Sequence, residues 1–124
     1  TKGIEMDQKF FVEAEHNKEC YLKKRGKKQA ILEFHHLIAE QYEINKQDQV
    51  FFFFNPFSIH VFREFMQHIL KSQEQYPRTI DIVLYYPSPD YLNYLQQDLA
   101  LDYYLNIKLQ HEKNDNERIV VFRV

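Results

Sequence analysis

Asn55, Pro56 and Phe57 form the stretch of the sequence best suited to chemistry. The Asn55 amide can both donate a hydrogen bond to a nucleophile and accept one from it. Pro56 stiffens the segment, which lowers the entropy cost of positioning a substrate, and Phe57 can stack on a planar acceptor. The same residues could instead simply end a strand, with Phe57 in the core. We interpret them as the candidate catalytic segment.

Histidine and cysteine give a weaker signal. His16 and Cys20 stand four residues apart on a predicted helix, so one face could offer nitrogen and sulfur to a metal. His35 or His36 could add a ligand, but only one of them, because neighbours on a strand point to opposite faces. A surface histidine and a buried cysteine explain the pattern without a metal, and we expect no metal site.

Two further groups could contact a substrate. The run at 23–28, KKRGKK, holds five cations in six residues. It could contact the phosphates of a nucleic acid, or it could be a solvated helix end, where cations are favoured. The second group is Tyr85, Tyr86, Tyr91 and Tyr94, which could line a pocket or pack in the core. Tyr86 ends a predicted strand, on the same rim as Asn55.

A regular order of elements must position these residues. We predict strands at 1–6, 30–34, 50–54 and 79–86, helices at 7–25, 59–72 and from 89 onward, one helical turn within 37–49, and a hairpin at 103–124. Asp7 is the expected N-cap of the first helix and Gly26 its C-cap residue. The expected apolar face of that helix holds Phe10, Phe11, Ala14, Cys20 and Tyr21 or Leu22. Residues 50–54, VFFFF, are apolar on both faces, which is typical of a central parallel strand covered by helices.

Strands that alternate with helices imply parallel pairing through right-handed crossovers. We therefore predict one α/β domain over residues 1–124, with a doubly wound, mostly parallel sheet and a C-terminal antiparallel hairpin. The chain has 124 residues, one cysteine, two glycines and a formal net charge of −2. These values leave no intramolecular disulfide, no glycine-rich phosphate loop and no global attraction to nucleic acid. With no apolar run of about 18 residues, we expect a soluble, cytoplasmic protein that does not bind membranes.

Six segments resemble the later part of a class I S-adenosylmethionine-dependent methyltransferase, a family with a Rossmann-like sheet. They are KGIEMD (2–7), FFVEAEHNKE (10–19), FHHLIAEQY (34–42), FFFFNPF (51–57), TIDIVLYYPSP (79–89) and the final hairpin. In element order they resemble the family from its second strand to its seventh. The Asn-Pro-Phe segment has one proline where the forms that methylate planar amino groups have two. It is more similar to the loops of small bacterial methyltransferases.

The resemblance implies a cofactor site at the ends of these strands. Glu5 would hold the ribose hydroxyls of S-adenosylmethionine, with Asp7 as its competitor, and Met6 would lie near the adenine. The loop after the third strand would contact the adenine amine through Ile38 or Ala39, where the family usually has an acid, or through Glu40 or Gln41 in their place. Asn55 would contact both cofactor and nucleophile, and Pro56 and Phe57 would complete the catalytic segment.

The implied function is methyl transfer to an N or O nucleophile of a substrate that the sequence does not define. The family's first strand and its glycine-rich loop would precede Thr1, so we expect this chain alone to be an inactive fragment that binds the cofactor weakly or not at all. Two alternatives stay open. One is a fragment of a nicotinamide-dependent oxidoreductase, because an acid after the second strand suits that ribose too. The other is a non-catalytic module that homodimerises through exposed strand edges.

Overall fold

The computed structural model describes residues 1–25, 31–109 and 114–124. These residues form an α/β structure with two separate sheets. The chain divides into two compact units, Thr1–Glu43 and Ile44–Val124, and each sheet belongs to one unit.

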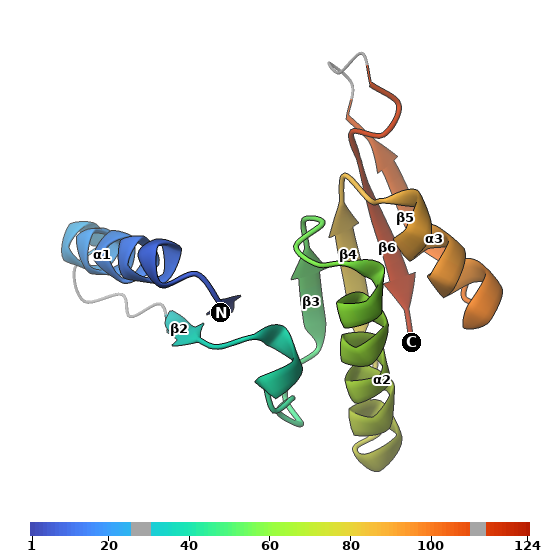
Figure 1. The fold of residues 1–124 in the computed structure, drawn as a ribbon, viewed down its shortest axis with the longest axis horizontal. Helices are drawn as coiled ribbons and strands as arrows, with labels where there is room; N and C mark the ends of the chain where they lie inside the picture. The colour runs from blue at the N-terminus through green and yellow to red at the C-terminus, as the bar shows by residue number, and fades with distance from the viewer. Residues whose placement is uncertain (26–30, 110–113) are drawn as a thin grey trace. The chain divides into compact units, whose positions relative to one another are not determined.

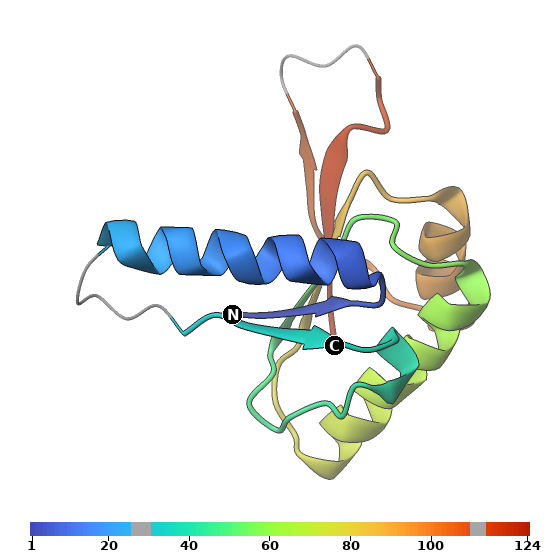
Figure 2. The same cartoon turned by 60° about the vertical axis from the view of Figure 1, so that its left-hand side comes forward.

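The Thr1–Glu43 unit is a β-α-β arrangement followed by a short 3₁₀ turn. Its elements are β1 (Lys2–Glu5), α1 (Gln8–Arg25), β2 (Glu33–His36) and η1 (Ala39–Gln41). β1 and β2 pair in parallel, and α1 lies alongside the pair (Figure 2). Asp7 caps α1 as predicted, because its carboxylate accepts from the backbone N–H groups of Lys9 at 2.8 Å and Phe10 at 3.2 Å.

Three predictions about the Thr1–Glu43 unit were wrong. β2 covers Glu33–His36, where a strand over 30–34 was predicted, because the pairing with β1 runs from Lys2 opposite Glu33 to Glu5 opposite His36. Phe10, Cys20 and Tyr21 are exposed, so the expected apolar face of α1 is narrower than the spacing suggested. Cys20 is therefore not buried. Gly26, the expected C-cap residue, and Lys27–Lys28 of the basic run lie outside the described residues.

The Ile44–Val124 unit packs helices against a four-stranded mixed sheet. Its elements are β3 (Val50–Phe53), α2 (Ile59–Gln75), β4 (Asp81–Tyr85), α3 (Pro89–Asn93), a π-helical turn η2 (Tyr94–Asp98), β5 (Tyr103–Lys108) and β6 (Arg118–Arg123). The strand order is β3-β4-β6-β5, with β3 and β4 parallel and the other two pairs antiparallel. The predicted C-terminal hairpin is thus confirmed as β5–β6 (Figure 1).

The core of this unit lies between the sheet and one layer of helices. α2 forms because apolar residues recur at helical spacing, and Phe62, Phe65, Met66 and Ile69 on its apolar face are buried. They meet the buried side chains of the sheet, which are Phe51, Phe53, Ile82, Leu84, Val120 and Phe122. α2 and α3 lie on the same face of the sheet (Figure 1).

The prediction that residues 50–54 form a central strand buried on both faces was wrong. β3 is an edge strand of its sheet, because only β4 pairs with it among the described residues. Phe51 and Phe53 face α2 and are buried, whereas Val50, Phe52 and Phe54 are exposed. A run of apolar residues in a strand shows that both faces of the strand are uncharged. It does not show that other elements pack on both faces.

A surface ion pair joins β4 to β6. Arg123 Nε and Nη2 donate to the Asp81 carboxylate at 2.7 and 2.9 Å, and these hydrogen bonds hold the pKa of Asp81 below its ordinary value of 3.8. A carboxylate with a lowered pKa stabilises the fold at pH values above its ordinary pKa. This stabilisation is lost as the pH falls through the lowered pKa of the folded state.

We expect the Asp81→Asn variant to lose less stability than the wild type between about pH 5 and pH 2. Urea unfolding followed by circular dichroism at several pH values measures this difference. Asp115→Asn is the matched control, because the Asp115 side chain is 99% exposed, and it should leave the pH dependence unchanged. An identical pH dependence for the Asp81→Asn variant and the wild type would contradict the assignment.

Candidate functional site

The Asn55 side chain joins the loops that follow two neighbouring parallel strands. Its Nδ2 donates to the backbone carbonyl of Tyr86, and its Oδ1 accepts from the backbone N–H of Ser88 at 3.0 Å. Asn55 adopts a left-handed backbone with φ of 41°, a conformation that asparagine tolerates better than most residues. The predicted placement of Tyr86 on the same rim as Asn55 is confirmed. The amide expected to hold a nucleophile therefore also has structural partners.

Tyr86 connects this pair of loops to the β5–β6 hairpin. Its backbone is also left-handed, with φ of 51°, and its hydroxyl oxygen accepts from Asn114 Nδ2 at 2.8 Å. We call Asn55, Pro56, Tyr86, Ser88 and Asn114 the β3–β4 rim. Two non-glycine residues with positive φ in adjacent loops store backbone strain, and such strain is concentrated at functional sites.

Tyr91 of α3 is hydrogen-bonded to the backbone of the loop after β3. Its hydroxyl donates to the backbone carbonyl of Phe57 at 2.7 Å and accepts from the Phe57 N–H at 3.2 Å. Burial raises the pKa of Tyr91, so the hydroxyl stays protonated at neutral pH. The Phe57 ring is half-buried and packs against Phe53 and Phe65, at centroid distances of 6.0 and 6.3 Å. Pro56 is exposed.

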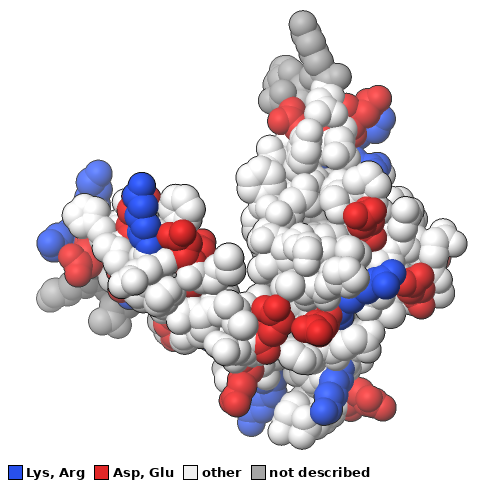
Figure 3. Space-filling view, in the orientation of Figure 1, with Lys and Arg blue, Asp and Glu red and all other residues white. Residues whose placement is uncertain are grey.

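The β3–β4 rim carries no charge. All five of its residues are neutral, and most of the surface over the carboxyl ends of β3 and β4 is white in Figure 3. Carboxyl ends of parallel strands are where open α/β sheets bind ligands. Uncharged polar groups there suit a neutral polar ligand better than a phosphate.

The Thr1–Glu43 unit places the expected ribose acid at the end of β1. Glu5 is half-buried, and its Oε1 accepts from the backbone N–H of Asp7 at 2.8 Å. The Asp7 carboxylate is engaged as the cap of α1. This leaves the second oxygen of Glu5 as the better candidate to accept from a ribose hydroxyl.

Two exposed apolar side chains lie in the loops after β1 and β2. Met6 is 71% exposed and Ile38 is 41% exposed, whereas Ala39 is buried. The loops are held together by two hydrogen bonds, from His36 Nε2 to the Met6 carbonyl at 3.1 Å and from the Leu37 N–H to the Glu5 carbonyl at 3.2 Å. Met6 and Ile38 can therefore contact a flat apolar ring, while Ala39 can offer only its backbone.

In the described part of the chain, the residues weighed as metal ligands form pairs and no larger group. His16 Nε2 lies 3.7 Å from Cys20 Sγ on the exposed surface of α1, and His35 Nε2 lies 3.7 Å from a carboxylate oxygen of Glu33. Among residues 1–25, 31–109 and 114–124, no three His, Cys, Asp or Glu side chains are grouped as a metal site would need.

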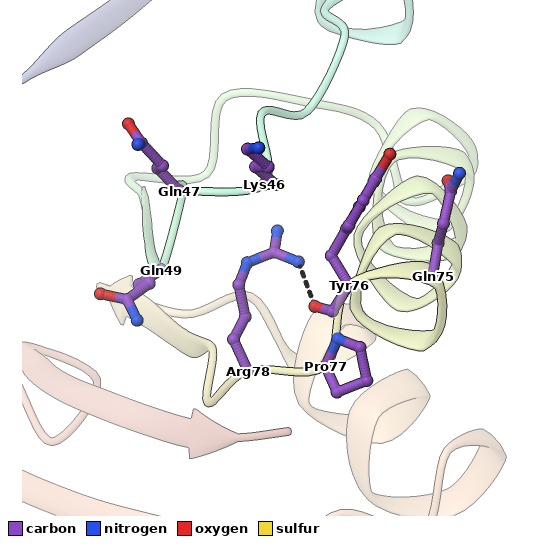
Figure 4. A pocket seen from close by; sticks show the side chains of 7 residues that line it. All are labelled: Lys46, Gln47, Gln49, Gln75, Tyr76, Pro77 and Arg78. Atoms are coloured by element: carbon purple, nitrogen blue, oxygen red, sulfur yellow. Dashed lines mark hydrogen bonds between the residues drawn. The ribbon is translucent and has the colours of Figure 1, made fainter.

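A surface hollow of about 560 Å³ lies at the other end of β3 and β4, away from the β3–β4 rim. Lys46, Gln47, Gln49, Gln75, Tyr76, Pro77 and Arg78 line it (Figure 4). Arg78 is its central cation, and its guanidinium donates to the backbone carbonyls of Asn45, Asp48, Ser72 and Tyr76 and to the Ser72 hydroxyl. Because these bonds engage every nitrogen of the guanidinium, we interpret the hollow as a structural junction.

Some of the rim was not found by sequence reasoning. Ser88 and Asn114 were missed, as was the hydrogen bond of the Tyr91 hydroxyl to the loop. The order Ser88-Pro89-Asp90 could have identified Ser88 as a helix N-cap, and its Oγ does accept from the Tyr91 N–H at 3.4 Å. The sequence holds no comparable signal for Asn114, because its contact joins positions 28 residues apart.

Comparison of the chain with protein-family models, curated proteins and solved structures gave no match. The helices in the described part of the chain are too short or too polar to cross a membrane. Any functional conclusion therefore depends on the residues and geometry described above.

Proposed function

We propose that this chain is part of an S-adenosylmethionine-dependent methyltransferase that methylates an N or O nucleophile. The observation that carries the proposal is the strand order of the two sheets. In the numbering that the resemblance implies, β1 and β2 are the second and third strands, and β3-β4-β6-β5 are the fourth, fifth, seventh and sixth.

That strand order supports a cofactor site built from the described residues. Ligands of open α/β sheets bind outside the carboxyl ends of the strands. Glu5 and Met6 follow β1, and Asn55 follows β3. The proposed roles are the ribose hydroxyls for Glu5, the adenine ring for Met6 and Ile38, and the adenine amine for the backbone of Ala39.

S-adenosylmethionine would supply a methyl group on a sulfonium sulfur, which keeps the bonding electron pair when the methyl leaves. The acceptor's lone pair forms the new bond, and the acceptor then loses a proton. The Asn55 amide retains a second N–H and a second oxygen lone pair beyond its bonds to Tyr86 and Ser88. These groups would orient the acceptor, and the stiff Pro56 segment would keep them in place. This chemistry needs no metal.

The two methionines of the chain allow a direct test. Met6 lies beside the proposed adenine contact, and Met66 is fully buried in the core of the other unit. We expect S-adenosylhomocysteine at millimolar concentration to shift the ¹³C-methyl NMR signal of Met6 and to leave that of Met66 in place. Glu5→Gln should weaken the binding by about tenfold, because it removes a charge-assisted hydrogen bond.

Glu13→Gln is the matched control, because Glu13 lies on the exposed surface of α1, and it should bind as the wild type does. A Met6 shift that Glu5→Gln leaves unchanged, or an equal loss of binding in both variants, would reject the cofactor site. The same titration with NADH tests the oxidoreductase alternative, which predicts that NADH shifts Met6 more strongly than S-adenosylhomocysteine does.

A further inference from the structure

The four-stranded sheet has a second face that the helices of its own unit leave uncovered. The strand registers place ten side chains there, and contacts with Tyr85 and Arg123 add Phe54 and Tyr104. The twelve are Val50, Phe52, Phe54, Asp81, Val83, Tyr85, Tyr104, Leu105, Ile107, Ile119, Val121 and Arg123. We call these residues the outer face. All of them except Asp81 and Arg123 are apolar or aromatic. An extended apolar surface of this kind marks an interaction site.

The apolar area of the outer face is close to what a dimer needs. Six of its side chains are about half or more exposed, namely Val50, Phe52, Phe54, Tyr104, Leu105 and Ile107. Together they present roughly 600 Å² of apolar surface, at the upper end of what a monomer usually shows. A standard interface buries about 800 Å² on each partner. The half-buried residues of β4 and β6 between these edges would add to the contact.

The charges of the outer face indicate which partner it fits. Asp81 and Arg123 neutralise each other through two hydrogen bonds, and the Arg123 guanidinium lies 3.6 Å from the centre of the Tyr104 ring. A charged partner such as a nucleic acid or an anionic membrane would meet no net charge here. Two copies of the same face would bring no unpaired like charges together.

We propose that the protein forms a homodimer in which the outer faces of two copies stack on each other. Two twisted sheets pack face to face at a distance of about 10 Å, and a twofold axis brings the same apolar residues of both copies together. The stacking differs from pairing of strand edges, which would use the backbone of an edge strand, β3 or β5 in this sheet. It uses no residue of the β3–β4 rim or of the proposed cofactor site.

Sedimentation velocity over a range of protein concentrations tests the dimer. We expect the wild type to sediment with twice the mass of one chain in the micromolar range typical of an interface of this size. Phe52→Lys and Leu105→Lys each place a charge on the outer face, and both should halve that mass. Val12→Lys is the matched control, because Val12 is an exposed residue of α1, and it should remain dimeric.

Circular dichroism of dilute samples shows whether each variant is folded. If Leu105→Lys unfolds, Leu105→Thr replaces it, because threonine keeps a high strand propensity. A monomeric wild type at all concentrations overturns the proposal. A dimer that only one of the Phe52 and Leu105 variants disrupts also overturns it, because that result indicates pairing through the edge strand that carries the residue, β3 or β5. The methionine titration reports the cofactor site separately, so the two proposals can fail independently.

Discussion

Replacing Phe62 by alanine is expected to lower the free energy of unfolding of the Ile44–Val124 unit by about 3–5 kcal/mol. Phe62 is fully buried at the start of α2. Its ring stacks on Tyr91 with centroids 3.8 Å apart and meets Phe53 edge-on at 5.4 Å. Alanine would leave a cavity between α2, α3 and the sheet, and it would remove the ring that supports Tyr91 beneath the loop after β3.

Urea unfolding followed by far-UV circular dichroism measures this loss. Phe10→Ala is the matched control, because it makes the same substitution at a side chain of α1 that is 57% exposed. We expect it to lower the free energy of unfolding by about 1 kcal/mol or less. If the two variants lost equal stability, Phe62 would not be part of the core.

The elements of the fold were largely predictable because they depend on local patterns. Apolar spacing identified α2, and the chain around Asn114 and Asn116 identified the β5–β6 hairpin. The lateral neighbours of a strand were not predictable in the same way. The residues of β3 are apolar on both faces, yet hydrogen bonding to a partner strand is set by the whole topology. Sequence reasoning therefore predicted an apolar strand correctly and its surroundings wrongly.

The candidate site was predictable only in part. Asn55 and Glu5 could be selected because their residue types suit a ligand and because each follows a strand. The hydrogen bonds of the Asn55 amide to Tyr86 and Ser88 could not be predicted, because they span more than 30 residues and depend on two left-handed backbones. These contacts change the interpretation of Asn55, since its amide stabilises the site as well as facing a substrate.

Replacing Asn55 by alanine is expected to lower the free energy of unfolding by about 2–4 kcal/mol. The variant loses two hydrogen bonds, each worth about 1 kcal/mol net. It also places alanine at a φ of 41°, a conformation less favourable for alanine than for asparagine by about 1 kcal/mol. Asn55→Gly separates the two causes, because glycine adopts positive φ without strain. We expect it to lose only about half as much stability as Asn55→Ala does.

Amide hydrogen exchange gives the local measurement, because the Ser88 N–H donates to the Asn55 side chain. It should exchange faster in both variants, whereas Asn93→Ala, a change at an exposed asparagine with an ordinary helical φ of −58°, should leave its exchange unchanged. Suppose instead that Asn55→Ala is as stable as the wild type and that Ser88 stays protected. The link between the two loops would then be dispensable, and selection of an asparagine at this position would have to be explained by contact with a ligand alone.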